Sequence, residues 1–317
     1  MTTEAGADVD VDVDVSVVVV TYNHAPFIER ALESVVAQQT TRSIEIIVSE
    51  DCSTDGTTEL VRAFAARERR ARLLLSARNV RSNEVVARAI RAARGRYICL
   101  LDGDDHWTSS AKLERQAAVL DAEPALSACF HNALIEREGS SPTSSTSSDD
   151  RWTPAHQPQR VSADEIWHGN PFATCAGMMR ANALRGLGPW YADLFPITDW
   201  PLYILCAEHG PLAFQDEVVG VYRLHGGGLF SSLPSRSKLD ATARFYRRMD
   251  AALGGRARDR KRAGATRYFF EWAVAYADEG DRSMARHCLA LSLRAGGVGR
   301  AVSRREWARC ARRVRPW

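Results

Sequence analysis

The sequence predicts an α/β protein with a mostly parallel sheet flanked by helices, followed by a C-terminal helical extension. Three observations predict this class. Apolar segments of strand length alternate with amphipathic segments of helical period up to about residue 120. The first apolar segment, Val15 to Val20, is almost entirely β-branched, as in strands buried on both faces of a parallel sheet. From about residue 239 onward the pattern is helical throughout.

The first half of the chain follows a regular order of strands and helices. We expect the first strand at 15–22, and the next helix has one apolar stripe formed by Ile28, Ala31, Leu32, Val35 and Val36. The same order continues with strands at 44–48, 72–75 and 97–101 and with helices at 57–69, 83–94 and 112–120. Right-handed crossovers join such units into a parallel sheet, and ligands bind beyond the carboxyl ends of its strands.

The second half is less regular. Residues 139–160 are rich in Ser, Thr, Pro and Asp, which predicts a mobile surface loop. Strands are expected at 173–179 and 218–224, with a helix at 201–209 between them.

These patterns divide the 317 residues into three parts. We expect a disordered acidic tail at 1–14, one domain at 15–235, and the helical extension at 236–317. The helices of the extension either pack on the domain or form a partner surface, through which the protein would oligomerise.

Composition narrows the class of partner and the compartment. A net charge of +3 gives no argument for a nucleic-acid partner, and the Arg-rich helices of the extension predict at most peripheral membrane contact. The seven cysteines are scattered, with no C-x-x-C pair, as in a protein with reduced thiols. We find no apolar run of about 20 residues and no signal-peptide pattern. We therefore expect a cytoplasmic protein, either free or peripheral to the inner face of the membrane.

The strongest local motif is the acidic cluster at the end of the fourth strand. Asp102, Asp104 and Asp105 lie within four positions, and side chains two apart on a strand point to one side. Concentrated negative charge at the edge of a core favours a hard divalent cation such as Mg²⁺ or Mn²⁺. A solvated acidic turn with helix-capping roles is the alternative.

Two other strand ends carry polar motifs. Glu50 and Asp51 follow the second strand, where a carboxylate can accept a hydrogen bond from a nucleobase, while Ser53 to Asp55 are better explained as caps of the next helix. Thr21-Tyr22-Asn23-His24 follows the first strand, where a base or ribose would lie, although a plain turn explains it equally well.

Two later residues carry the remaining chemistry. Asp199 begins a predicted helix, so it is either a helix cap or a general base, and its spacing favours the cap. His225 ends a strand before Gly226-Gly227-Gly228, so it is either structural or a metal ligand beside a loop that closes over a ligand.

Taken together, these segments resemble the family 2 glycosyltransferases, whose catalytic domain has the GT-A fold of nucleotide-diphospho-sugar transferases. The resemblance covers about 15–228 and rests on Thr21-Tyr22-Asn23, on the stretch from Glu50 to Thr57, on Asp102-Gly103-Asp104-Asp105, on Asp199-Trp200 and on the stretch from Tyr222 to His225. Glu50 and Cys52 depart from the family pattern, which usually has Asp and Gly there.

The resemblance implies a role for each matching residue. Thr21 and Asp51 would contact the nucleoside, and Asp102 would lie on the ribose or metal side. Asp104 would bind Mn²⁺ or Mg²⁺ with His225 nearby, and Asp199 would be the catalytic base. The other residues expected to bind the nucleotide-sugar are Tyr22, Asn23, Glu50, Gly103, Asp105 and Trp200.

The function implied is a single displacement that inverts the anomeric centre, with a UDP-sugar as the default donor. The acceptor would be a glycan, a lipid-linked glycan or a small natural product. The alternative is a binding or scaffold protein with the same fold and no turnover. A haloacid-dehalogenase type of phosphotransferase also has Asp-x-Asp after a strand, but there the motif follows the first strand, whereas here it follows the fourth.

Overall fold

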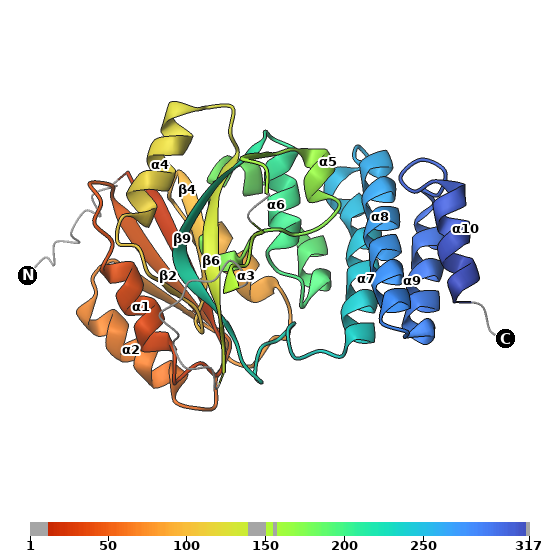
Figure 1. Ribbon diagram of the computed structural model, residues 1–317. Coiled ribbons are helices and arrows are strands. Elements are labelled where there is room, and N and C mark those ends of the chain that lie inside the picture. The colour runs from red at the N-terminus through yellow and green to blue at the C-terminus, as the bar shows by residue number, and fades with distance from the viewer. Residues whose placement is uncertain (1–11, 139–149, 155–156, 315–317) are drawn as a thin grey trace, which may run out of the picture.

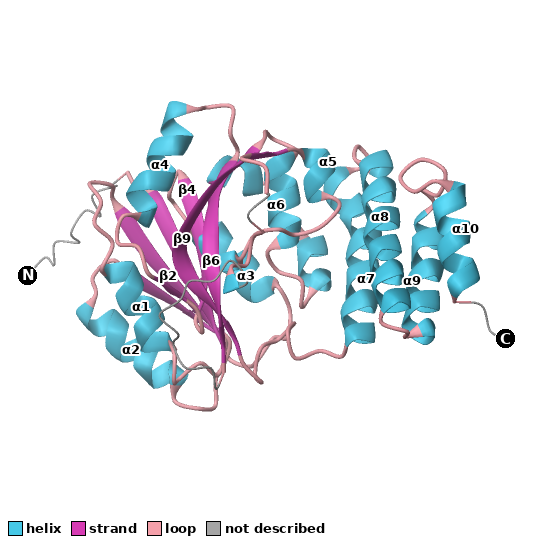
Figure 2. Cartoon of the chain, in the orientation of Figure 1, coloured by secondary structure: helices cyan, strands magenta, loops and turns pink. Residues whose placement is uncertain are grey.

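The computed structural model describes residues 12–138, 150–154 and 157–314. Within these residues the core is a nine-stranded sheet in the order β3-β2-β1-β4-β8-β6-β9-β5, with β7 paired to β9. Helices cover the sheet, and the C-terminal helices stand beside one another at one end of the molecule (Figures 1 and 2). The predicted α/β class with a helical C-terminal extension is confirmed.

The first half contains every strand and helix that the sequence predicted. It consists of β1 (Val15–Thr21), α1 (Ile28–Val36), β2 (Ile44–Glu50), α2 (Thr57–Arg67), β3 (Ala71–Leu75), α3 (Glu84–Ala92), β4 (Tyr97–Asp102), β5 (His106–Trp107) and α4 (Lys112–Ala122). Strands β1 to β4 pair in parallel. Alternate residues of β1 face opposite sides, since Val17 packs in the cluster that includes α1, α2 and α4, and Val18 packs in the cluster that includes α3. Only the two-residue β5 was not predicted.

The second half departs from a parallel sheet. It contains β6 (Ala128–Arg137), β7 (Arg160–Val161), α5 (Ala163–Ile166), β8 (Gly177–Arg180), α6 (Trp200–Ala207) and β9 (Leu212–Leu224), with 3₁₀ turns between them. Strand β8 runs antiparallel to both β4 and β6, whereas β6 and β9 are parallel.

Two predictions for this half need correction. The strand expected at 173–179 is a 3₁₀ turn at Thr174–Ala176 followed by β8, because a short buried apolar run does not by itself distinguish a turn from a strand. The strand expected at 218–224 begins earlier, at Leu212. Strand β6 was not predicted.

The extension consists of α7 (Ser235–Leu253), α8 (Arg258–Asp278), α9 (Arg282–Ala295) and α10 (Arg304–Arg313). These helices share a buried core with the domain instead of forming a separate unit. Phe245 of α7 stacks on Trp200 of α6 with ring centroids 4.6 Å apart, and Phe269 of α8 belongs to the same buried cluster. The extension therefore holds α6 in place.

The predicted tail and loop lie partly outside the described residues, which begin at 12 and omit 139–149 and 155–156. Their described parts are packed. Val13 is buried, and the Asp14 backbone N–H donates to Ser43 Oγ at 2.8 Å. Thr153 is buried, and its N–H donates to Asn132 Oδ1 at 3.0 Å. The predictions of a disordered tail and a mobile loop are therefore corrected for 12–14 and 150–154, where backbone groups bond to the strands beside them.

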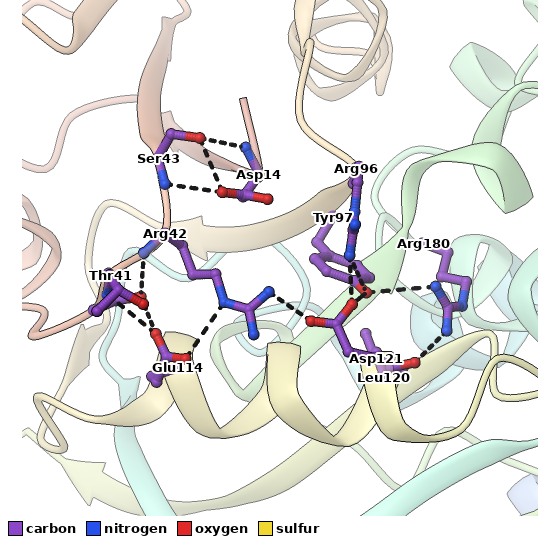
Figure 3. Close-up of polar contacts among 11 residues, drawn as sticks. Asp14, Thr41, Arg42, Ser43, Arg96, Tyr97, Glu114, Leu120, Asp121 and Arg180 are labelled. Atoms are coloured by element: carbon purple, nitrogen blue, oxygen red, sulfur yellow. Dashed lines mark hydrogen bonds and ion pairs between the residues drawn. The ribbon is translucent and has the colours of Figure 1, made fainter. Parts of the chain in front are cut away.

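A polar network ties α4 to the amino ends of the strands (Figure 3). Arg42 bridges Glu114 and Asp121 of α4, with its Nη1 2.5 Å from Asp121 Oδ2, and the Tyr97 hydroxyl donates to Asp121 Oδ1 at 2.6 Å. Partly exposed ion pairs of this kind contribute little each, typically about 0–1 kcal/mol. Because the network lies at the opposite end of the strands from the acidic cluster, we assign it a structural role.

Candidate functional site

A cavity of about 700 Å³ lies beyond the carboxyl ends of β1 and β4. It brings together residues far apart in the sequence, because Asp102 and Asp104 from the end of β4 line it together with Asp199 from the start of α6. This volume is within the usual range for small-molecule sites, roughly 300–1,000 Å³. Four of the predicted site residues line this cavity: Asp102, Asp104, Asp199 and Trp200.

Three carboxylates at this cavity interact electrostatically. Burial raises the pKa of Asp102 to about 8, and the nearby charges of Asp104 and Asp199 add to the rise. Burial also raises the pKa of Asp199. Such crowding destabilises the ionised forms unless a cation or strong donors compensate. Perturbed carboxyl pKa values in a cavity are typical of functional sites.

Asp104 forms the centre of a cluster with two histidines. Its Oδ2 lies 2.9 Å from His225 Nε2 and 3.6 Å from His24 Nε2. Burial alone would raise the pKa of Asp104, but the hydrogen bond with His225 and the charge of His24 hold it below its usual value. The hydrogen bond with Asp104 in turn raises the pKa of His225. Residues from the ends of β1, β4 and β9 thus meet here.

The cluster of Asp104, His225 and His24 has donor atoms that suit a divalent cation. In the described part of the chain, no group of three or more His, Cys, Asp or Glu side chains forms a metal cluster. Asp104 and His225 nevertheless provide an oxygen and a nitrogen ligand in direct contact, and the buried His24 Nδ1 has no hydrogen-bond partner in the structure. Mg²⁺ and its analogues commonly bind to one or two protein ligands plus substrate phosphates. The donor set therefore fits a cation that shares its coordination with a diphosphate.

Asp105 is not among the residues that line the cavity, and it links two strands that carry the cluster. It is buried, and its Oδ1 accepts from the Arg223 backbone N–H at 2.8 Å, which joins the β4 end to β9. Burial raises its pKa well above the usual range. Gly103 is needed for close packing, because a Cβ there would lie 2.7 Å from Thr21 Oγ1 and 2.9 Å from His24 Nδ1. We therefore assign positioning roles to Gly103 and Asp105.

Asp199 caps α6 and also lines the cavity. Its Oδ1 accepts from the Trp200 backbone N–H at 2.7 Å, as a helix cap does. Its Oδ2 accepts from Asn170 Nδ2 at 2.9 Å and from Thr174 Oγ1 at 3.4 Å, while the residue lines the cavity. A carboxylate has about four acceptor positions, so capacity for a further hydrogen bond remains.

The turn after β1 is built mainly from internal contacts. Asn23 adopts a left-handed backbone with φ of 56°, its N–H donates to Ser53 Oγ, and its Oδ1 accepts from the Thr54 N–H at 2.8 Å. Thr21 is buried and its Oγ1 has no hydrogen-bond partner in the structure, while Tyr22 is partly exposed. Asn23 thus joins this turn to the one after β2.

The carboxylates after β2 are likewise occupied. Glu50 is buried and accepts from the backbone N–H groups of Cys52 at 3.0 Å and Ser53 at 2.6 Å. Asp51 accepts from the Val80 N–H at 3.1 Å and from Ser76 Oγ at 2.8 Å. Neither lines the large cavity. These contacts explain both carboxylates structurally, and nucleoside contact by Asp51 stays a prediction.

Several residues of the site were not predicted from the sequence. Asn170 and Thr174 orient Asp199, and the Arg223 side chain bonds to Glu136 and to the Asp104 backbone carbonyl. No local pattern marks either residue, because Asn170 lies outside helices and strands and Thr174 lies in a 3₁₀ turn. Trp200, predicted to bind the nucleotide-sugar, is largely buried and its Nε1 donates to the Ile166 carbonyl at 2.8 Å, so much of its role is in the core.

Comparison with known proteins assigns the family. The family model described as "Glycosyl transferase family 2" matches residues 16–185, which is more than half of the chain, and the chain belongs to this family. An uncharacterized protein of Mycobacterium tuberculosis is 31% identical over 214 residues, covering 67% of this chain and 59% of that protein. The chain thus spans about three fifths of the length of this relative.

Solved structures agree on the GT-A fold. The structure of S. aureus TarS in complex with UDP-GlcNAc superposes with a TM-score of 0.63 at 16% identity, covering 95% of this chain and 88% of that one. The mannosyltransferase PcManGT from Pyrobaculum calidifontis, in complex with GDP-Man and Mn²⁺, gives a TM-score of 0.53 at 21% identity, with 96% and 81% coverage. At such low identity the likeness establishes the fold alone. Over the ranges that the structure describes, we find no helix apolar and long enough to span a bilayer.

Proposed function

We propose that the chain is an inverting glycosyltransferase that moves a sugar from a UDP-sugar to an acceptor hydroxyl. The observation that carries the proposal is the shared cavity, in which Asp102 and Asp104 from β4 lie across from the unrelated segment that carries Asp199. Family membership supports the reaction class, and the nucleotide-sugars bound by the two structural neighbours support the class of donor.

On the donor side, Asp104 and His225 would hold Mn²⁺ or Mg²⁺. A divalent cation there would neutralise the negative charge that grows on the departing diphosphate. The protein's own contribution is to fix the two ligands. Asp105 anchors the Arg223 backbone, and the Arg223 guanidinium bonds to the Asp104 carbonyl, so the ends of β4 and β9 are held together.

On the acceptor side, Asp199 would accept the proton of the attacking hydroxyl. Asn170 and Thr174 hold its Oδ2, and the Trp200 N–H holds its Oδ1, so the carboxylate keeps one orientation. Burial raises its pKa, which makes it a stronger base than an exposed Asp. Direct attack by one acceptor oxygen, with no enzyme nucleophile, inverts the anomeric configuration.

The first test is turnover of a panel of nucleotide-sugars by the full chain, with Mn²⁺, with Mg²⁺ and with EDTA. We expect release of UDP from UDP-sugars in the presence of the cation. NMR of the product should show the anomeric configuration opposite to that of the donor sugar. Binding of UDP-sugars without hydrolysis or transfer to any acceptor would instead favour a non-catalytic binding protein. Preference for GDP-sugars would correct the donor assignment without affecting the reaction class.

The acceptor class in this proposal is a glycan, free or lipid-linked, and the site of action is cytoplasmic or at the inner face of the membrane. Fractionation of cells that express the full-length protein tests the second point. Recovery with membranes only at low salt would indicate peripheral contact through the basic helices.

A further inference from the structure

The large cavity continues past the carboxylates to the C-terminal extension. Tyr268, Glu271 and Trp272 of α8 line it, together with Leu229 of the loop after β9. All four lie outside residues 16–185, which match the family model. These four residues, called the α8 wall below, therefore lie outside the region that the family model matches.

The wall presents apolar side chains to solvent. Among the described residues, the large hydrophobic side chains that are exposed are Val36, Leu229, Trp272 and Leu293. Two of these four, Leu229 at 55% and Trp272 at 42% exposure, line the cavity. Exposed aromatic surface that is concentrated at a cavity indicates a ligand contact, because single exposed apolar residues are otherwise scattered.

Aromatic packing connects this wall to the carboxylate proposed as the base. Trp200, which follows Asp199 directly, lies 5.7 Å from Tyr268 between ring centroids, and Tyr268 lies 6.4 Å from Trp272. Tyr276 packs on the other side of Trp272 at 5.7 Å. The Trp272 ring is therefore held in a fixed relation to α6 and to Asp199.

The charges at the α8 wall disfavour an anionic acceptor. Glu271 is a carboxylate of the wall itself, and Arg223 is the one Lys or Arg among the described residues that line the cavity. The Arg223 guanidinium is occupied by Glu136 and by the Asp104 carbonyl. The Glu271 carboxylate has an ion pair 3.6 Å long with the exposed Arg267, which does not line the cavity. A group that carries hydroxyls and no negative charge fits this surface best.

We propose that the α8 wall binds a neutral sugar residue of the acceptor, an inference that rests on the proposed glycosyltransferase function. The apolar C–H face of the sugar ring would pack on Trp272, and Glu271 would accept hydrogen bonds from ring hydroxyls. Such a combination of an aromatic surface with a few polar groups is typical of small-molecule sites. The extension thereby determines which acceptors reach Asp199.

Direct binding tests this site independently of turnover. The probes are p-nitrophenyl N-acetyl-β-glucosaminide, p-nitrophenyl β-glucoside and p-nitrophenyl β-glucuronide, titrated by ligand-observed NMR into the full chain with UDP and Mn²⁺. We expect at least one neutral glycoside to bind at least about fivefold more tightly than the glucuronide, because the glucuronide carboxylate would lie beside the like charge of Glu271. Equal or tighter binding of the glucuronide, or no binding of either neutral glycoside at 10 mM, about the weakest affinity of interest, would overturn the proposal.

Variants locate the site on the wall. Trp272→Ala should weaken binding of the neutral glycoside about tenfold, and Trp272→Phe should weaken it by less. Leu293→Ala, which changes an exposed apolar residue on α9 outside the cavity, should leave binding unchanged. Glu271→Lys, a change on an exposed helix surface, should weaken the neutral probe and improve binding of the glucuronide. If Trp272→Ala and Glu271→Lys both bind all probes as the wild type does, the acceptor site lies elsewhere.

The two proposals fail in different ways. Absence of sugar transfer with every nucleotide-sugar would reject the proposed function while the probe titrations still report on the α8 wall. If transfer occurs, Trp272→Ala should raise the acceptor KM about tenfold and change the donor KM little. A proportional rise in both KM values would contradict an acceptor role for the wall.

Discussion

Two acidic turns of similar composition have different roles in this protein. After β2, the carboxylates of Glu50 and Asp51 accept hydrogen bonds from backbone N–H groups and from Ser76. After β4, Asp102 and Asp104 face a cavity together with Asp199, and their pKa values are shifted in opposite directions. Acidic composition alone therefore does not distinguish a turn whose carboxylates bond to backbone N–H groups from one whose carboxylates face a cavity.

The different surroundings explain this separation. Glu50 and Asp51 lie beside loops that supply N–H donors within the first half of the sheet. Asp102 and Asp104 lie where the sheet changes from parallel to mixed pairing. The segments that lie beside them there are β9 and the start of α6. Those segments bring His225 to Asp104 and a third carboxylate to the cavity, while the Arg223 backbone N–H of β9 donates to Asp105.

The largest expected effect is for Asp199, which lines the cavity together with Asp102 and Asp104. Asp199→Asn should lower kcat by about 10²–10⁴ with little change in donor affinity, because it removes the base and keeps a good helix cap. Steady-state kinetics and UDP titration measure the two effects. A variant with near-normal kcat would reject Asp199 as the base.

The pH profile offers an independent check on Asp199. Burial raises the pKa of this carboxyl, so protonation removes the base at a higher pH than for an exposed Asp. The wild-type kcat should therefore fall on acidification, with an apparent pKa above that of an exposed Asp. A flat profile down to pH 4, a value near the ordinary Asp pKa, would contradict this expectation.

The next effect tests the Asp104 and His225 pair. Asp104→Asn and His225→Ala should each raise the Mn²⁺ concentration needed for half-maximal activity by about 10- to 100-fold or more, since loss of even an indirect metal contact has that effect. Activity measured against free Mn²⁺ gives the midpoint. Glu138→Gln is a matched control, because Glu138 accepts from the Gly226 N–H beside His225 without contacting Asp104. Unchanged midpoints in both variants would place the cation elsewhere.

At the turn after β2, a substitution should lower stability and leave turnover nearly unchanged. Glu50→Ala should reduce the free energy of unfolding by about 1–3 kcal/mol, because the N–H groups of Cys52 and Ser53 lose their acceptor. Thermal or denaturant unfolding measures this loss, and the turnover of the folded fraction should remain near that of the wild type. A large loss of donor affinity at unchanged stability would instead assign Glu50 to the nucleotide site.

The smallest expected effect concerns Asp102. Its pKa is raised to about 8 in the folded protein, so ionisation opposes folding and stability is lost as the pH rises from about 4 to about 8 in the absence of divalent cations. Since Asp102 lies at a cavity and is only partly buried, Asp102→Asn should gain about 1–2 kcal/mol at pH 8 and nothing at pH 4. Chemical unfolding at both pH values, with EDTA, measures the difference. An equal effect at both values would contradict the raised pKa.

Local sequence patterns were sufficient to predict the regular first half of the protein and to identify its acidic motifs. Period-two and period-3.6 patterns depend only on neighbouring residues, which is why β1 to β4 and their helices were predicted with nearly correct ends. The same patterns predicted that Asp102, Asp104 and Asp199 would lie at strand or helix ends. They did not distinguish a strand from a 3₁₀ turn at Thr174–Ala176, and they gave no sign of β6.

Which polar residues lie in contact depends on the tertiary structure. Asp104 and His225 are separated by 121 positions and Asn170 and Asp199 by 29, so no local pattern relates them. The same holds for Trp272, which reads in sequence as one more residue of an amphipathic helix. Its place at the cavity results from the packing of α8 against α6, and packing between distant segments is the one contribution that local periodicity does not contain.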